Sequence, residues 1–367
     1  MTSYGFWDSP LSATEVVAAA TTIDMLSAVR AGSGRVIWAE SRPQEGGRIT
    51  LIEPNADGEE REVLPEGYSA RSAVHEYGGA AFSIIDGSIY FVNWEDQRIY
   101  RLDGSVTAVT EEPPSPRSWR YSVITGSVDQ LFAIRERHEA DTVLNEIVAI
   151  CDGEMSVVAG GSDFYDAATP SPSGERLAWI EWDHPNMPWD ETRLVVANKD
   201  GSDAVVVASG AAVQQPSWVD DDTLVYLDDR SGYWNLYRHE LSSGTDTPLY
   251  EIDHDMGYAP FLLGTSTYAV VDENRIAAVV IRDGMDELGV IEDGQFQACA
   301  PGLSFVRGLV ADGGIVYFVG ASFTQGMAIY RLEEDNELQL VSTPKPVPLD
   351  EDYIAVGEHH SFDSGDR

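Results

Sequence analysis

The sequence predicts an all-β fold, a seven-bladed β-propeller whose blades are four-stranded antiparallel sheets. Three observations support this prediction. Runs rich in β-branched and aromatic residues recur roughly every 40 to 53 residues, the spacing typical of propeller blades. Turn residues separate further β-rich segments within each repeat, and glycine is plentiful, at 33 of 367 residues. Helical periodicity is nearly absent, so the β-rich repeats account for most of the chain.

The repeating unit is clearest in residues 171–202. A Ser-Pro-Ser-Gly turn at 171–174 leads into the β-rich run 176–182, and a loop at 183–190 leads into a second run, 193–198. Pro and Gly end strands, and the Asp-Gly pair in the turn that follows suits a tight reversal. We therefore interpret the segment as an antiparallel meander that forms one blade.

The same succession occurs seven times along the chain. The predicted second strands are residues 35–39, 88–92, 130–134, 176–182, 223–227, 275–280 and 315–319. The predicted third strands are residues 48–53, 98–103, 146–151, 193–198, 235–240, 287–292 and 328–333. Short fourth strands follow at residues 62–64, 106–109, 155–158, 204–208, 247–250, 296–299 and 338–341. Because each blade packs only on its neighbours, a propeller of this length needs no single continuous core.

A short helical segment precedes the repeats. Residues 12–31 are predicted to hold a helix, because Ser12 is a good N-cap and Glu15 stands at the position that completes a capping box. We assign residues 1–24 to an N-terminal extension.

The propeller itself is predicted to cover residues 25–343. Residues 344–367 follow as a linker, because Pro344, Pro346 and Pro348 disfavour both helix and strand pairing. We interpret this last segment as a linker and the start of a domain that is absent from this chain.

The charge of the chain argues against several classes of partner. It carries 62 acidic residues against 23 basic ones, for a net charge of −39. Such a surface repels phosphate backbones and anionic membranes, so we expect no nucleic-acid and no membrane partner. The acidic surface is interpreted as an aid to solubility or an adaptation to salt, with acid-mediated binding of a partner as the alternative.

The cysteine content and the N-terminal sequence indicate a cellular compartment. Cys151 and Cys299 are too few and too far apart for a disulfide framework. The first 16 residues have no basic region followed by an apolar core, and no run approaches the length of a membrane span. We expect a cytoplasmic, reduced protein.

Two segments carry candidate binding residues. A His75-Glu76 pair is predicted to enter a strand that soon reaches Gly78 and Gly79, which would let another backbone or a ligand approach closely. The alternative is that this segment simply lines the central channel as an inner strand, where small residues help seven strands to converge.

The loop at residues 183–190 is the second candidate. It is stiffened by two prolines and carries His184, Met187 and Trp189. A rigid aromatic loop at the edge of a propeller is suited to a contact surface, and packing between blades is the alternative.

Two equivalent connections, residues 93–100 and 228–237, are simpler to interpret. Their acidic and Asn side chains are suited to holding a turn, and their aromatic side chains to packing between blades. The second connection contains Arg230 and Trp234.

Four collinear motifs make a family resemblance specific: residues 74–79, 91–100, 181–190 and 229–237. In these motifs the chain resembles the N-terminal propeller of prolyl-oligopeptidase-type serine peptidases, most closely the dipeptidyl-aminopeptidase and acylaminoacyl-peptidase branch. The likeness extends from Tyr4 to Tyr353. Residues 255–264 depart from the family pattern, in which a Glu-Phe pair followed by Pro and Trp is expected.

The resemblance implies a propeller that covers an α/β-hydrolase domain and restricts access to its active site to short peptides. The implied partners are therefore the hydrolase domain, in the same chain or a separate one, and short peptide substrates. The candidate residues for substrate binding or for the domain interface are His75, Glu76, Tyr77, His184, Met187, Trp189, Arg230 and Trp234.

No catalytic centre is predicted in these 367 residues. An α/β-hydrolase presents its serine on a Gly-x-Ser-x-Gly turn, and every Gly-x-Ser triplet of this chain lacks the final glycine. No Cys pair and no His-x-x-x-His spacing indicates a metal site, so we expect neither a metal nor another cofactor. We interpret the chain as the non-catalytic propeller of a peptidase whose hydrolase domain is missing from it.

Two alternatives stay open at this point. A free-standing binding propeller, similar to the TolB scaffold, would need a ring that closes on its own. A propeller lyase or glycosidase would need side chains such as His75, Glu76 and Arg230 to converge at the channel mouth.

Overall fold

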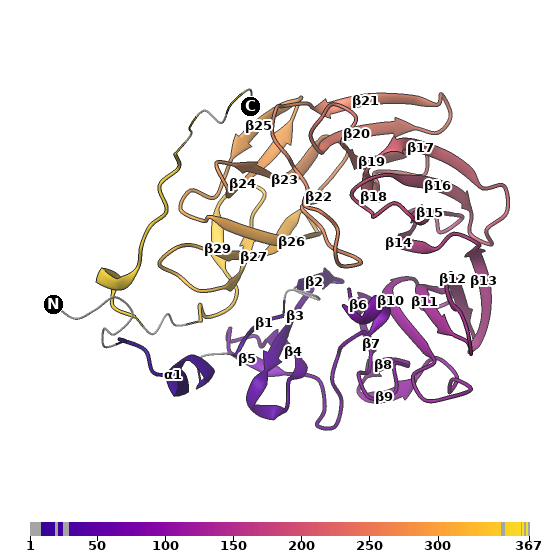
Figure 1. The fold of residues 1–367 in the computed structure, drawn as a ribbon, viewed down its shortest axis with the longest axis horizontal. Coiled ribbons are helices and arrows are strands. Elements are labelled where there is room, and N and C mark those ends of the chain that lie inside the picture. The colour runs from indigo at the N-terminus through magenta and orange to yellow at the C-terminus, as the bar shows by residue number, and fades with distance from the viewer. Residues whose placement is uncertain are drawn as a thin grey trace.

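A computed structural model describes residues 9–18, 21–24, 29–345, 349–360, 362 and 365. Seven antiparallel sheets follow one another around a ring, from the indigo N-terminal sheet to the yellow C-terminal one (Figure 1). The predicted seven-bladed propeller of four-stranded blades is confirmed.

The first three blades use the following strands. Blade 1 consists of β2 (Val29–Gly32), β3 (Arg35–Arg42), β4 (Arg48–Pro54) and β5 (Glu60–Glu62), with the two-residue β1 (Thr22–Ile23) also paired to β3. Blade 2 consists of β6 (Phe82–Ile85), β7 (Ser88–Val92), β8 (Ile99–Asp103) and β9 (Ser105–Ala108). Blade 3 consists of β10 (Trp119–Gly126), β11 (Leu131–His138), β12 (Val143–Cys151) and β13 (Glu154–Gly160).

The last four blades have the same order. Blade 4 consists of β14 (Phe164–Pro170), β15 (Arg176–Trp182), β16 (Thr192–Asn198) and β17 (Val205–Ala211). Blade 5 consists of β18 (Val213–Trp218), β19 (Thr223–Asp228), β20 (Asn235–Glu240) and β21 (Thr245–Tyr250). Blade 6 consists of β22 (Tyr268–Val270), β23 (Arg275–Arg282), β24 (Met285–Glu292) and β25 (Gln295–Ala298). Blade 7 consists of β26 (Phe305–Asp312), β27 (Ile315–Ala321), β28 (Ala328–Leu332) and β29 (Leu338–Leu340).

The second strand of a blade is buried on both faces because a neighbouring blade covers each face. All five residues of β7 are buried, as are the last five of β19. Such strands carry continuous apolar runs, whereas the outermost strands β9 and β29 contain no buried residue. The core therefore lies between blades, and this explains why the second strands were the clearest signal in the sequence.

Asp-Gly pairs make several of the tight hairpins. In the pair Asp86-Gly87 both residues have positive φ, 49° and 77°, and Asp152-Gly153 has 51° and 83°. Two successive positive φ values define the two-residue turn that matches the twist of a hairpin, and Asp and Gly tolerate them.

The ring closes between blades 7 and 1 by side-chain packing, and each of these blades is complete within its own strands. Ile23, Val29 and Trp38 of the first sheet form one buried cluster with Val319 and Ile329 of the last. Polar contacts reinforce this junction: the N–H of Gly34 donates to Asp312 Oδ2 at 2.8 Å, and Lys345 Nζ lies 3.2 Å from Glu40 Oε2.

The helix predicted over residues 12–31 is much shorter than expected. It covers Ala13–Ala18 (α1), and the capping box is present, since the N–H of Glu15 donates to Ser12 Oγ and the N–H of Ser12 to Glu15 Oε2. The prediction is wrong for 22–23 and 29–32, because β1 and β2 pair with β3 in blade 1. Pairing with a partner strand overrides the weak helical pattern there.

The segment after the last blade has little regular structure. Pro346 and Pro348 lie outside the described residues; a single 3₁₀ turn, η4 (Glu351–Tyr353), follows. Residues 354–360 join none of the sheets, and the side chains of Tyr353 and Val356 are exposed. In the described part of the chain, no helix is long and apolar enough to cross a membrane.

Candidate functional site

The connection between β21 and β22 crosses the central channel, and we call its residues 257–267 the strap. In Figure 1 this orange loop reaches the middle of the ring, beside β14 and β6. Its carbonyl at Leu263 accepts a hydrogen bond from the N–H of Ala80 in blade 2, at 2.9 Å. On the other side, the N–H of Thr267 donates to Gln215 Oε1 at 2.8 Å. The strap therefore spans the channel from one side of the ring to the other.

Gly264 of the strap is contacted from two sides of the ring. Its N–H donates to Asp166 Oδ1 of β14 at 3.0 Å, and its carbonyl faces Arg30 Nη2 of β2 at 3.5 Å. Burial raises the pKa of the Asp166 carboxyl to about 7, although two backbone N–H groups partly offset this effect.

Gly79, which follows the His75 turn, allows this crossing. A Cβ atom on Gly79 would lie 2.9 Å from Leu263 Cβ, 3.0 Å from the Leu263 carbonyl oxygen and 2.7 Å from Ser122 Oγ. Only glycine admits the strap at this distance. The sequence suggested that Gly78 and Gly79 let either another backbone or a ligand approach closely. In the structure it is the backbone of the strap that approaches Gly79.

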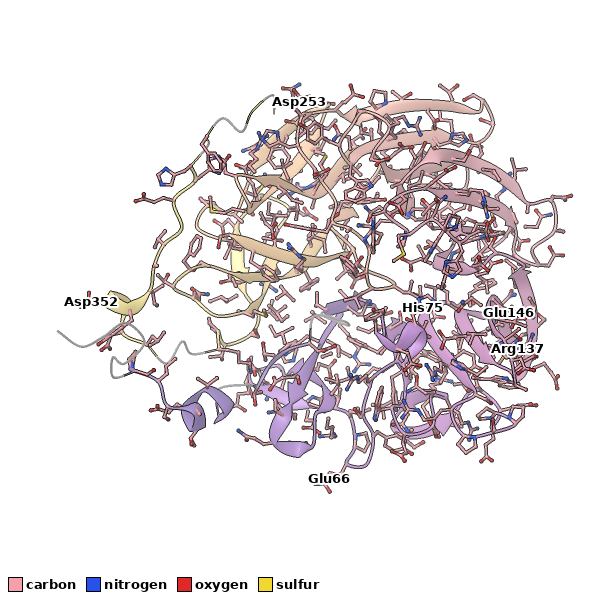
Figure 2. The ribbon with its side chains drawn as sticks, in the orientation of Figure 1. Glu66, His75, Arg137, Glu146, Asp253 and Asp352 are labelled. Atoms are coloured by element: carbon pink, nitrogen blue, oxygen red, sulfur yellow. The ribbon has the colours of Figure 1, made fainter. Side chains whose placement is uncertain are left out.

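The predicted strand at His75 is wrong. Residues Val74–Glu76 form a 3₁₀ turn (η3), in which His75 and Glu76 have φ values of 55° and 64°. Non-glycine residues in this region are strained, and such strain persists only where surrounding contacts hold it. Figure 2 shows His75 nearer to the channel than the Arg137 and Glu146 side chains of blade 3.

A pocket of about 610 Å³ opens beside the strap, and we call it the basin. Its walls come from blades 2, 3 and 4 and from the strap. The basin brings together six of the eight predicted candidates: His75, Glu76, Tyr77, His184, Met187 and Trp189.

The back wall of the basin is aromatic. The ring of Phe164 is stacked on Trp182 at 5.3 Å, and the rings of His75 and His184 meet it edge-on at 5.2 and 5.0 Å. These four side chains come from three separate segments, so their contacts fix the position of both histidine-bearing loops.

The outer wall joins the loop at 183–190 to the strap. Trp189 is partly buried and packs on Phe261 of the strap, with ring centroids 4.5 Å apart. Tyr77, Phe261 and Met187 remain exposed, at 71%, 67% and 44%. The basin therefore presents a contiguous group of large apolar side chains to the outside.

A buried carboxylate holds the floor of the basin. Glu136 accepts a hydrogen bond from the N–H of His75 at 2.7 Å and pairs with Arg120 at 3.1 Å and with His138 at 2.5 Å. Arg120 also pairs with Glu76 at 2.5 Å, and this bond lowers the pKa of Glu76. This network holds the strained turn in place.

The His75 imidazole is neutral at neutral pH. Burial lowers its pKa, and this effect outweighs the nearby Glu136 charge and the hydrogen-bond contact with Asn145 at 3.3 Å. It therefore contributes a polar ring rather than a positive charge to the basin.

The loop at 183–190 is held by an ion pair and by hydrogen bonds from its backbone. Arg193 pairs with Asp183 at 2.7 Å, and this hydrogen bond lowers the pKa of Asp183. The N–H of His184 donates to Asp163 Oδ2, and the N–H of Met187 to Asp190 Oδ2, each at 2.9 Å. The backbone is thus fixed at both ends of the aromatic stretch.

Arg230 and Trp234 do not line the basin. Arg230 pairs with Asp228 and, at 3.1 Å, with Asp246, and these partners raise its pKa. Trp234 donates its indole N–H to the carbonyl of Ala212 at 2.9 Å. Both side chains hold blade 5 together, in agreement with the turn-and-packing interpretation of their connection.

A propeller lyase or glycosidase would need His75, Glu76 and Arg230 to converge. They do not, because His75 and Glu76 line the basin and Arg230 lies outside it. Within the described ranges, no three His, Cys, Asp or Glu side chains are grouped so that they could hold a metal ion.

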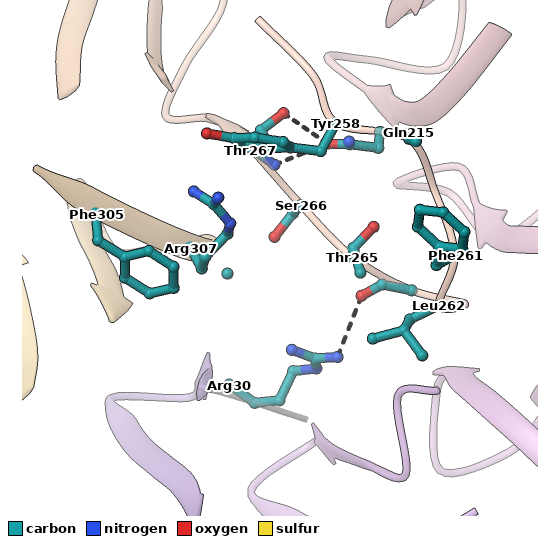
Figure 3. Close-up of a pocket in the computed structure, with 13 residues that line it drawn as sticks. Arg30, Gln215, Tyr258, Phe261, Leu262, Thr265, Ser266, Thr267, Phe305 and Arg307 are labelled. Atoms are coloured by element: carbon teal, nitrogen blue, oxygen red, sulfur yellow. Dashed lines mark hydrogen bonds between the residues drawn. The ribbon is translucent and has the colours of Figure 1, made fainter. Parts of the chain in front are cut away.

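A second cavity, of about 430 Å³, lies against the strap and was not predicted (Figure 3). It contains Arg30 of β2 and Arg307 of β26, and Phe261 belongs to both this cavity and the basin. Its two arginines are 277 positions apart in the sequence, and no local motif marks either of them.

The chain is similar in sequence and fold to several solved structures of peptidases. No family model and no curated protein matches the chain. Among solved structures, a puromycin-hydrolysing peptidase of Mycobacterium tuberculosis is 29% identical with a TM-score of 0.86, over 94% of this chain and 56% of that one. A puromycin hydrolase is 25% identical with a TM-score of 0.90, over 100% of this chain and 60% of that one.

A more distant likeness, to an acylaminoacyl peptidase of Pyrococcus horikoshii, concerns the fold alone, with 14% identity and a TM-score of 0.64 over 88% of this chain and 52% of that one. The chain thus spans little more than half the length of these peptidases. The resemblance to the propeller region of prolyl-oligopeptidase-type serine peptidases is confirmed.

Proposed function

We propose that this chain is the substrate-gating propeller of a serine peptidase that acts on short peptides, of the dipeptidyl-aminopeptidase or acylaminoacyl-peptidase type. One observation carries the proposal: six candidate residues from separate motifs line one basin, in a chain that is 29% identical to the propeller region of a puromycin-hydrolysing peptidase. The serine nucleophile and its oxyanion hole would come from an α/β-hydrolase domain.

The surface chemistry of the basin supports a covering partner. Tyr77, Met187 and Phe261 are large apolar side chains in exposed positions. Clusters of this kind are typical of interfaces, where they become buried on association. We infer that the hydrolase domain covers this face of the ring.

The dimensions of the basin support a small substrate. A volume of about 610 Å³ is within the usual range for small-molecule sites. The strap crosses the channel beside it, so a substrate would reach a covered basin from the side rather than through the ring. Long chains would then be excluded by the space between the propeller and the hydrolase domain.

A free-standing binding propeller is the second candidate, and the ring closure supports it. Blade 1 and blade 7 are each complete, so no strand from elsewhere is needed to close the ring. We keep the cytoplasm as the proposed location for either function; Cys151 and Cys299 are both free thiols.

The reading frame beyond Arg367 tests the two candidates directly. A Gly-x-Ser-x-Gly in a strand-turn-helix context soon after this residue would support the peptidase. A stop codon, with no hydrolase gene beside it, would favour the binding propeller.

A biochemical test complements the genetic one. Residues 1–367 should not hydrolyse aminoacyl or dipeptidyl chromogenic substrates, and adding the hydrolase domain should create the activity. Turnover by the purified chain alone that a serine-directed inhibitor abolishes would contradict the proposal.

A further inference from the structure

The second cavity differs from the basin in its walls and in its charge. Basin residues come from blades 2 to 4, whereas the cavity is bounded by blades 1, 5 and 7, and the strap contributes to both. In Figure 3, Arg30 and Arg307 enter the cavity from two sides, and the strap with Leu262 and Phe261 forms a third. No carboxylate is among the described residues that line it.

Arg30 is the least compensated of these groups. Its guanidinium donates to two carbonyl oxygens, that of Val29 at 2.8 Å and that of Gly264 at 3.5 Å, and lies 5.8 Å from the ring centre of Phe82. Burial lowers its pKa to about 10, so the group remains charged at neutral pH. It forms no ion pair with any described residue, in a protein that has 62 acidic side chains.

The carboxylate on the far side of Gly264 compensates this charge only in part. Asp166 accepts hydrogen bonds from the N–H groups of Gly264 and Ala167, at 3.0 and 2.7 Å, rather than from Arg30. Because burial raises its pKa to about 7, it is partly protonated near neutral pH. A partly buried positive charge without a full counter-charge is costly, and an anion that enters the cavity would remove that cost.

Arg307 adds a second guanidinium group, which is paired with a carboxylate and held in a fixed orientation. Its partner Asp286 is buried behind the wall and also accepts a hydrogen bond from the hydroxyl of Tyr258. The guanidinium is held over the rings of Tyr258 and Phe305, at 3.8 and 4.5 Å. The cavity thus combines two guanidinium groups with aromatic walls.

We propose that this cavity binds a small carboxylate with an apolar body, whose carboxylate pairs with Arg30 while its body packs against Phe261, Leu262 and Phe305. A guanidinium matches the geometry of a carboxylate in two parallel hydrogen bonds. The cavity volume of about 430 Å³ accommodates one such group.

The C-terminal residue of a short peptide has this chemistry. That assignment rests on the proposed function, whereas the carboxylate site itself rests on the cavity alone.

Two matched compounds test the site: N-acetylphenylalanine and its amide, which differ only in the carboxylate. We expect the acid to raise the Tm of the protein by about 3 °C at saturation and the amide to leave it unchanged. Equal effects of acid and amide would overturn the carboxylate site. Sulfate that displaces the acid at similar concentration would overturn the role of the apolar body.

Arg30→Met tests the residue, because it keeps the length of the side chain and removes its charge. We expect at least tenfold weaker binding of the acid, together with a higher Tm of the free protein. Arg331→Met, at a partly exposed arginine that pairs with Glu333 in blade 7, is the matched control and should bind as the unaltered protein does. Unchanged binding by folded Arg30→Met would overturn the proposal.

Arg30→Lys serves if the methionine variant does not fold, since it keeps the charge. It should bind the acid more weakly than arginine does, and equal binding would again contradict the paired geometry.

A competition separates the two proposals. If tripeptides with a free C-terminus displace N-acetylphenylalanine and their amides do not, the peptide assignment is supported. If neither displaces it, the carboxylate site stands and its assignment to peptide substrates fails.

Discussion

The basin and the second cavity share the strap as a wall, yet they satisfy their charges in opposite ways. In the basin, Glu136 is surrounded by Arg120, His138 and the N–H of His75, and large apolar rings face outward. In the second cavity, Arg30 has only carbonyl oxygens as hydrogen-bond partners. On the two proposals made above, the site whose charges are paired internally meets a partner through its apolar surface, while the site with the unpaired Arg30 charge binds a small carboxylate with an apolar body.

Removal of the buried Glu136 charge from the basin should have the largest effect on the stability of the protein. Glu136→Gln leaves Arg120 without its buried counter-charge and should lower the free energy of unfolding by about 3 kcal/mol, as measured by urea denaturation. Glu139→Gln, at an exposed residue of the same blade, is the control and should cost less than about 0.5 kcal/mol. Similar losses in the two variants would show that pairing at Glu136 does not hold the basin.

Displacement of the strap should affect both sites at once. In Gly79→Ala the new methyl group meets Leu263 and Ser122 at 3.0 Å or less, which should cost about 2 kcal/mol and weaken binding in both cavities. Gly160→Ala is the control, because the nearest atom to its methyl group would be Val157 Cγ1, at 3.6 Å. If Gly79→Ala left both stability and binding intact, the strap would be more adaptable than its contacts indicate.

The Asp166 carboxyl, which contacts the strap shared by the two sites, should make the stability of the folded protein depend on pH. Its pKa is raised from 3.8 to about 7, so the folded protein bears no penalty below pH 4 and an increasing one as the pH rises towards 7. Asp166→Asn keeps an oxygen acceptor for Gly264 and has no charge to bury. Its stability relative to the unaltered protein should therefore improve by about 2 kcal/mol between pH 5 and pH 7.5.

Thermal or urea unfolding of both proteins across this pH range measures the difference. A stability difference that stays constant with pH would show that Asp166 titrates normally.

The smallest stability effect is expected at the outer wall of the basin. Trp189→Ala loses contact with Phe261 but leaves the blades intact, so Tm should stay nearly unchanged. In the complete peptidase, kcat/KM for short peptides should fall about tenfold, because the wall that positions the substrate is lost. A large fall in Tm without a change in kcat/KM would assign Trp189 to packing instead.

The sequence predicted the blades well because their signal is local. Each second strand is a continuous apolar run next to turn residues, and each pairs with strands close by in the chain. The helix predicted over 12–31 was wrong at its C-terminal end because Val29–Gly32 pairs as a strand with Arg35–Arg42, and this pairing overrides the weak helical pattern.

The two sites differ in the same way. His75 and Trp189 stand in motifs that can be recognised one at a time, so the sequence named six of the residues that line the basin without showing that they lie together. Arg30 and Arg307 stand in no such motif. They lie in blades 1 and 7 and share a cavity because the ring closes between these blades. The strap itself was visible only as the departure of residues 255–264 from the family pattern.

The contacts of the strap also bear on the order in which the molecule assembles. Every blade joins strands that are consecutive in the sequence, so the contacts within a blade close only short loops. The strap instead joins Gly264 to Arg30, 234 residues away, and to Asp166, 98 residues away. The entropy lost in closing such long loops is recovered only when the blades already stand in a circle. The strap is then the last element to settle, and protection of its amide hydrogens from exchange would report a finished ring.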